Sequence, residues 1–213
     1  MKNISKLTLA LALGFSSVAN AGFSNQYVAS RLSYANMQYT DSITKEKTDD
    51  DLGALSVAYG FNVATPIRLE AELNVHSSKE DKSENDLLKY GYYYYDNMSV
   101  STVTSMFNVY YDFVNSSRFT PFVMAGFGAS VISYDYEKTE LTPSGRYYHI
   151  EDNDSKSDFA YQVGLGLSFK INRHFIADVM YKYADLGDFK FNWNTNKLEQ
   201  TEDLISAGVR YTF

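Results

Sequence analysis

Apolar and polar residues alternate with a period of two along much of the chain. The clearest example is the segment 159–169, whose odd positions are Phe, Tyr, Val, Leu, Leu and Phe and whose even positions are Ala, Gln, Gly, Gly and Ser. The same alternation recurs over 102–113 and 175–183. A period of two indicates a β-strand with one apolar face. The pattern predicts eight strands, at residues 26–39, 52–61, 67–75, 99–113, 119–136, 157–169, 175–184 and 204–213.

The segments between these strands are of two kinds. Three are short, at residues 62–66, 114–118 and 170–174. Four are long and polar, at residues 40–51, 76–98, 137–156 and 185–203; each holds five acidic residues, and together they carry a net charge of −10. Short turns that alternate with long loops are typical of bacterial outer-membrane barrels. We therefore expect an all-β fold: an eight-stranded antiparallel transmembrane β-barrel with short periplasmic turns and long extracellular loops.

A soluble eight-stranded barrel of the lipocalin type is the main alternative for an alternating, exported chain. Such a barrel needs an apolar interior, whereas the face opposite the aromatic one carries charged and amide side chains here. A soluble barrel would have to place its many Phe and Tyr side chains inside a narrow lumen. The polar character of the face opposite the aromatic one therefore favours a membrane barrel.

The first 21 residues have the features of a secretory signal peptide. Lys2 and Lys6 precede an apolar segment at 7–15, and the small residues Ala19 and Ala21 follow it. The apolar segment is too short to span a bilayer as a helix. We expect residues 1–21 to be cleaved, which leaves one barrel domain at 22–213 in the cell outer membrane of a Gram-negative bacterium.

Composition narrows the classes of partner and chemistry. Cysteine is absent, so the sequence predicts neither disulfide bonds nor a thiolate nucleophile. Loss of residues 1–21 changes the net charge from −7 to −9, which argues against nucleic acid as a partner. The chain contains 14 Phe, 19 Tyr and 1 Trp, and an aromatic-rich sequence without long apolar runs suits a membrane barrel.

Several strand segments resemble a known family of small outer-membrane barrels. The segment 26–34 (QYVASRLSY) is similar to the first strand of OmpA-like barrels, with Arg31 at the position of an inward basic residue. The segments 108–113 (NVYYDF), 120–123 (TPFV) and 181–187 (YKYADLG) resemble strands of the opacity-protein branch. The resemblance covers nearly all of the mature chain. It implies a surface protein with variable loops, which in some relatives contact host cells.

Charged side chains on the predicted lumenal face form the first candidate site. In a narrow lumen these charges must pair, because an unpaired buried charge costs several kcal/mol. The favoured interpretation is a structural plug, since an eight-stranded barrel is only wide enough for its own side chains. A narrow porin that passes small solutes is the alternative. The residues are Arg31, Arg68, Glu70, Glu72, Asp112, Asp178, Lys182 and Arg210.

A run of tyrosines in the second predicted loop forms the second candidate site, at Tyr90, Tyr92, Tyr93, Tyr94 and Tyr95. Clustered tyrosines provide a large contact area at low entropic cost and are enriched where proteins recognise partners. The run could equally cap the barrel or join an aromatic girdle at the membrane interface. We expect a host-cell or matrix ligand here if the first interpretation holds.

The C-terminal strand has an alternating pattern that ends on an aromatic residue. Val209, Tyr211 and Phe213 fall on one face of this strand. The pattern resembles the signal that is read by the outer-membrane assembly machinery. Lipid and lipopolysaccharide of the outer membrane are the other partners expected of a monomeric barrel.

Catalysis and cofactor binding have little support in the sequence. His76 and His149 fall in predicted loops, and His174 falls in a predicted turn, without a recognisable catalytic motif nearby. His149 lies close to Glu151 and Asp152, but acidic residues in loops are usually solvated. Neither acidic run, at 49–51 or at 151–154, has the spacing of a defined cation loop. We expect a surface-interaction protein without catalytic residues, metal or cofactor.

Overall fold

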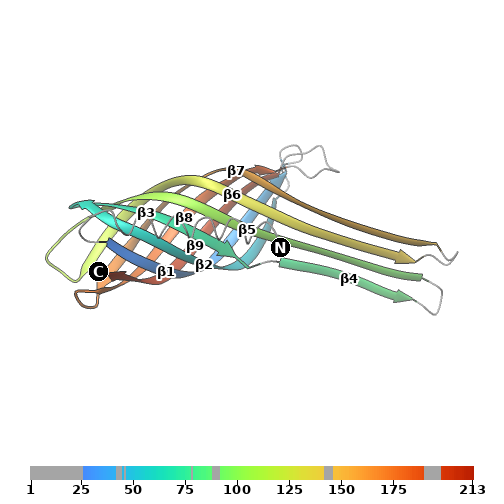
Figure 1. Cartoon of the computed structure of the whole chain (residues 1–213), viewed down its shortest axis with the longest axis horizontal. Coiled ribbons are helices and arrows are strands. Elements are labelled where there is room, and N and C mark those ends of the chain that lie inside the picture. Colours follow the sequence, from blue (N-terminus) through green and yellow to red (C-terminus); the bar gives the residue numbers. More distant parts are fainter. Residues whose placement is uncertain are drawn as a thin grey trace.

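The computed structural model describes residues 26–41, 45, 47–77, 79–87, 92–141, 146–189 and 198–213, so the predicted signal peptide lies outside the described residues. None of the described residues forms a helix long and apolar enough to cross a membrane. The regular elements are β-strands (Figure 1). They are β1 (Gln26–Asp41), β2 (Lys47–Ala64), β3 (Ile67–His76), β4 (Lys79–Leu87), β5 (Tyr92–Asp112), β6 (Phe119–Leu141), β7 (Tyr147–Lys170), β8 (Phe175–Phe189) and β9 (Leu198–Thr212).

Eight of these strands form a closed antiparallel barrel. β1 pairs with β2 on one side and with β9 on the other, and β3 closes the sheet by pairing with β5. The predicted eight-stranded antiparallel barrel is therefore confirmed. β4 lies outside the closed barrel, because it pairs with the first half of β5 beyond the end of β3.

One end of the barrel, which we call the turn end, carries the short connections and both ends of the described chain. The backbone N–H of Phe213 donates to the carbonyl of Gln26 at 3.1 Å. In the β7–β8 turn, Asn172 Oδ1 accepts hydrogen bonds from the N–H groups of His174 and Phe175, both at 2.9 Å. An asparagine side chain that replaces backbone partners in this way stabilises a tight turn. We call the opposite end the open end.

The barrel wall is apolar on the outside and polar on the inside. On β7, Leu165 is 60% exposed on the outer face, whereas Gln162 on the lumenal face is 3% exposed. On β1, Leu32 is 70% exposed and its neighbour Arg31 is 2% exposed. The apolar side chains therefore face outward and the polar ones face the lumen, as expected of a barrel surrounded by hydrocarbon.

Glycines on the lumenal face make room for the large side chains that fill it. A Cβ added to Gly208 would lie 2.9 Å from the Cα of Arg31. Gly166 lies on the lumenal face next to the outward-facing Leu165. The alternation by itself would predict that a small side chain is tolerated at position 166. A Cβ at Gly166 would in fact lie 2.6 Å from the carbonyl oxygen of Val179, a contact that the backbone cannot easily relieve. The lumenal glycines are thus a packing requirement.

A four-stranded sheet, which we call the arm, continues beyond the open end of the barrel (Figure 1). It consists of β4 and of residues 92–100 of β5, 133–141 of β6 and 147–155 of β7. Most of the predicted loops 76–98 and 137–156 are therefore strands, and the strand boundaries predicted there were wrong. The β1–β2 and β8–β9 strands also extend into the predicted loops 40–51 and 185–203. The described side chains on both faces of the arm are at least partly exposed to solvent, so its sequence lacks the alternation that marks a strand with one apolar face.

Candidate functional site

Arg31 and Glu70 form a buried ion pair at the centre of the lumen. The guanidinium of Arg31 donates to both carboxylate oxygens of Glu70, at 2.9 and 2.7 Å. Tyr27 and Tyr110 donate their hydroxyl protons to the same carboxylate, at 3.0 and 2.9 Å. A bidentate pair with further donors satisfies the buried charges and links β1, β3 and β5 across the barrel.

Glu72 is the second carboxylate at the centre of the lumen. Lys182 Nζ lies 3.0 Å from Glu72 Oε1, and Arg31 Nη1 lies 3.8 Å from the same atom. Asn108 donates to Glu72 Oε2 at 2.9 Å, and Gln162 donates to Asn108 Oδ1 at 2.7 Å. These contacts extend the network to β7 and β8.

Two further ion pairs lie toward the turn end. Arg68 donates to both oxygens of Asp112, at 2.7 and 2.9 Å. Arg210 Nε lies 2.7 Å from Asp178, and Ser168 also donates to Asp178 at 2.7 Å. The structure thus places all eight predicted lumenal charges in the lumen and brings each into an ion pair. Side chains that cross-link the strands occupy the lumen.

His76 and Glu202 are buried at the open end of the lumen, and sequence reasoning missed both. His76 Nε2 lies 2.7 Å from Glu202 Oε2, and Nδ1 lies 3.2 Å from the carbonyl oxygen of Thr102. The prediction that His76 falls in a loop was wrong, because this residue ends β3. The alternation of polar residues at 68, 70, 72 and 74 continues to 76 and could have identified it. An apolar cluster lies nearby, formed by Ala35, Met37, Met106, Ala160, Ala184, Leu186 and Leu204.

The inner face of the arm continues the lumenal face of the strands and carries a connected polar network. Tyr94 donates to Asp96 at 2.7 Å, and Lys138 Nζ lies 5.4 Å from the centre of the Tyr94 ring. Lys138 also lies 3.7 Å from Glu140. Partial burial and the nearby Asp96 carboxylate raise the pKa of Tyr136. The lysine on this face is therefore already engaged within the arm.

The outer face of the arm continues the outer wall of the barrel and differs in chemistry. Glu137 of β6 lies directly opposite Glu151 of β7 in the strand register. Asp135 lies two residues away on the same face and is exposed. No basic partner of these three carboxylates occurs among the described residues. Like charges that face each other across two strands are unfavourable, so this face lacks the charge balance of the inner face.

The predicted tyrosine site is divided by the strand geometry. Tyr90 lies outside the described residues, and the residues 92–95 belong to β5 rather than to a loop. Because successive side chains of a strand point to opposite faces, Tyr94 lies on the inner face and Tyr93 and Tyr95 lie on the outer face. All three are half-buried, so they do not form a single exposed patch. The correction follows from β5 extending past the barrel.

Exposed aromatic and apolar side chains lie instead at the start of β7, which sequence reasoning missed. Tyr147 is 65% exposed, Tyr148 is 48% exposed and Ile150 is 52% exposed. The ring of Tyr147 stacks on the ring of His149, with centroids 6.4 Å apart. A run of aromatic and β-branched residues at 147–150 was available as a strand signal, but the surrounding charges obscured it.

The histidine of the arm, His149, contacts a side chain of the neighbouring strand. His149 Nδ1 lies 3.0 Å from the hydroxyl of Thr139 on the neighbouring strand. In the described part of the chain, no three His or acidic side chains converge in a way that could hold a metal ion.

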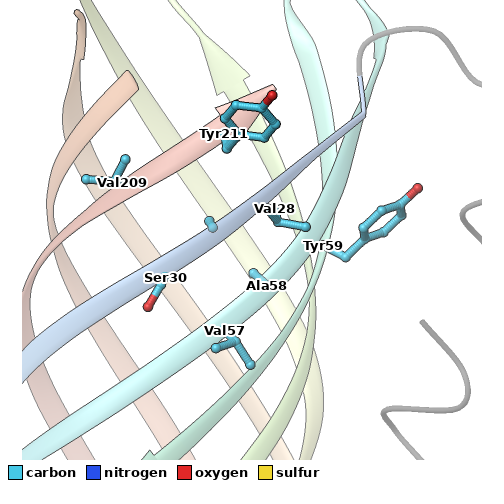
Figure 2. A pocket seen from close by; sticks show the side chains of 8 residues that line it. Val28, Ser30, Val57, Ala58, Tyr59, Val209 and Tyr211 are labelled. Carbon is cyan, nitrogen blue, oxygen red and sulfur yellow. The ribbon is translucent and has the colours of Figure 1, made fainter. Parts of the chain in front are cut away.

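An apolar groove of about 430 Å³ runs along β1 on the outer wall (Figure 2). Val28 and Ser30 form its centre, between Val57 and Tyr59 of β2 and Val209 and Tyr211 of β9. Two of the three predicted C-terminal signal residues therefore line this groove. The third, Phe213, is 67% exposed and packs edge-on against Tyr211, with ring centroids 5.4 Å apart.

Comparison with known proteins identifies a family that spans the barrel. The family model described as "Outer membrane protein beta-barrel domain" matches residues 7–213. The outer membrane protein PagN of Salmonella typhimurium is 28% identical over 146 residues, which are 67% of this chain. The match spans 60% of PagN, so the chain covers only part of that relative's length.

Solved structures of low sequence identity share the fold. Neisserial surface protein A superposes with a TM-score of 0.56 at 17% identity, over 88% of this chain and 97% of that one. Ail, the attachment invasion locus protein of Yersinia pestis, superposes with a TM-score of 0.52 at 14% identity, over 90% of this chain and all of that one. The Ail structure contains the heparin analogue sucrose octasulfate.

Proposed function

The chain belongs to the outer membrane protein β-barrel family, and on that premise we propose that it is a surface adhesion protein whose barrel anchors it and whose arm makes the contact. It is an outer-membrane protein of a Gram-negative bacterium. Because short turns of such barrels lie in the periplasm, the open end and its arm face the outside. The observation that carries the proposal is the arm itself, a sheet that extends past the barrel with exposed aromatic residues on β7.

Similarity to surface proteins supports this proposal. Ail is by its name an attachment protein, and Neisserial surface protein A is by its name a surface protein. Natural proteins blunt long exposed strands because such strands invite association, so an extended sheet in contact with the medium suits a binding role. We expect a host-cell or matrix ligand, bound by protein that is monomeric in the membrane.

The lumen supports anchoring over transport of small solutes. Arg31, Glu70 and Glu72 lie at its centre in a hydrogen-bonded network with side chains from several strands. Opening a path would require these buried pairs to separate, which costs several kcal/mol for each uncompensated charge. We therefore propose that the lumenal network is a structural plug.

Replacing the exposed residues of β7 tests the adhesive role. The combined variant Tyr147→Thr, Tyr148→Thr and Ile150→Thr removes contact area but keeps strand-forming residues. If these residues are central contacts, cell binding should weaken by about tenfold or more. The measurement is binding of purified protein in lipid nanodiscs to cultured host cells and to immobilised matrix proteins.

The control replaces an exposed aromatic residue by threonine at the turn end. Phe113 is 50% exposed just after β5 ends, on the side away from the arm, and Phe113→Thr should leave binding unchanged. Both variants should keep the heat-shifted gel mobility of the folded barrel. Equal binding by wild type and the triple variant would refute the role of the arm.

The C-terminal residues Val209, Tyr211 and Phe213 are proposed to act during assembly. Deletion of Phe213 should reduce the amount that reaches the outer membrane in cells far more than it reduces stability after refolding in detergent. Phe213 packs against the ring of Tyr211 and is largely exposed, so its loss removes little burial. Quantitative blotting of outer-membrane fractions gives the first quantity, and a urea titration gives the second. A normal yield of the truncated protein in the membrane would argue against the assembly role.

A further inference from the structure

One edge of β7 in the arm, along residues 147–153, is not covered by a neighbouring strand in the described part of the chain. We call it the open edge of β7. β7 pairs with β6 along its whole length, but its pairing with β8 begins only at Tyr161. Residues 147–153 therefore present backbone groups on the side away from β6. Uncovered strand edges of this kind bind extended polypeptides by adding a strand to the sheet.

The register shows which backbone groups face this edge. The N–H of Lys170 donates to the carbonyl of Arg118 on the β6 side at 2.9 Å. The β6–β7 register is unbroken from there to Tyr147, so every even residue of β7 points its N–H toward β6. The N–H groups of the odd residues His149, Glu151 and Asn153 consequently point toward the open edge.

Charge indicates what kind of strand fits this edge. The four strand segments of the arm contain eleven acidic and three basic residues, and residues 147–155 contain no Lys or Arg. β4, the opposite edge of the sheet, contains two lysines, which are residues that commonly protect an edge. Glu151 of β7 lies next to the open edge with Glu137 opposite it on β6, and a positive side chain on an added strand would relieve their repulsion.

A second copy of the chain fits this edge poorly. Pairing of two β7 edges would bring Glu151 and its acidic neighbours of both copies together, which is unfavourable. A sulfated polysaccharide is disfavoured for the same reason, because its charge has the same sign as that of the arm. An extended basic polypeptide is the occupant that satisfies both the backbone and the charge of the edge.

We propose that the arm binds a basic, extended segment of a partner protein as an additional strand on the open edge of β7. This inference rests on the proposed adhesive function and specifies its partner class. Backbone hydrogen bonds to the odd residues of 147–153 provide affinity, and the carboxylates of Glu137 and Glu151 select for Lys or Arg. Tyr148 and Ile150 provide apolar contact on the other face of the added strand.

The test uses the full-length protein in nanodiscs and three probes. The first is an alternating Thr-Lys peptide of about ten residues, which is long enough to form one strand. The second is the corresponding Thr-Glu peptide, and the third is heparin. We expect the Lys peptide to bind by fluorescence anisotropy, with weaker binding at high salt, and the other two probes not to bind. Preferential binding of heparin or of the Glu peptide would overturn the proposal.

A proline substitution separates strand addition from simple charge attraction. Asn153→Pro removes an N–H that points to the open edge and leaves the β6 ladder and the charge intact. It should weaken binding of the Lys peptide by about five- to tenfold, whereas Asn153→Thr should leave it unchanged. Both variants should retain the heat-shifted gel mobility of the wild type. Equal binding by the two variants would show that no strand is added and would overturn the proposal.

These outcomes are independent of the test of adhesion. Host-cell binding that depends on Tyr147, Tyr148 and Ile150 but is unaffected by Asn153→Pro would leave the proposed function standing and remove the strand-addition mechanism. Peptide binding that responds to Asn153→Pro in a protein that binds no host cells would retain the edge site and remove the adhesive function.

Discussion

An Arg31→Met variant is expected to lose about 3–5 kcal/mol of folding stability, because the substitution leaves the buried Glu70 carboxylate without its cation. Arg31 is 2% exposed and donates to both oxygens of Glu70. The hydroxyl groups of Tyr27 and Tyr110 would remain, but neutral donors do not replace a charge. Urea titration in lipid vesicles, followed by gel mobility of unheated samples, measures the loss.

Two further variants show whether burial of the ion pair is the cause. Lys156 and Asp154 also approach to 2.7 Å, but their side chains are 41% and 29% exposed. Lys156→Met should therefore cost about 1 kcal/mol or less. The double variant Arg31→Met with Glu70→Leu removes both charges and should be more stable than Arg31→Met alone. A double variant that is less stable than the single one would contradict this account of the lumen.

A Leu165→Arg variant is expected to lose about 2–4 kcal/mol of stability in a bilayer, since it places a charge on the lipid-facing wall. Leu165 lies in the middle of the barrel part of β7, between Val123 of β6 and Tyr181 of β8, and all three side chains are exposed on the outer wall. A folding titration in phospholipid vesicles measures the effect. The loss should be larger in vesicles than in detergent micelles, where an arginine side chain reaches water more easily.

The same substitution farther along β7 provides the control. Tyr147 is 65% exposed, slightly more than Leu165, but it lies in the arm. Tyr147→Arg should leave stability unchanged within about 0.5 kcal/mol, as for most surface substitutions. Gly166 is not a suitable control, because any side chain there meets the Val179 backbone. Equal losses at Leu165 and Tyr147 would place the membrane boundary elsewhere.

The barrel itself could be predicted from the sequence because the alternation that it requires is visible between neighbouring residues. A strand with hydrocarbon on one side and a packed lumen on the other must alternate, and segment 159–169 alternates large apolar residues with small or polar ones throughout. The same rule placed Arg31, Glu72 and Lys182 on the lumenal face. The cost of burying an unpaired charge also predicted that the lumenal charges form pairs, but it could not predict which residues pair.

The arm, the identity of the ion pairs and the open edge of β7 were decided only by the tertiary structure. Strands with water on both faces need no alternation, so residues 79–87 and 147–155 resemble polar loops in the sequence. Glu70 selects Arg31, and Glu72 lies against Lys182, because register and curvature place residues from distant strands across one narrow lumen. His76 and Glu202 meet for the same reason, although 126 positions separate them in the chain. Composition and local pattern indicate whether a residue requires lipid, water or a buried partner. Closure of the sheet determines which residue becomes that partner.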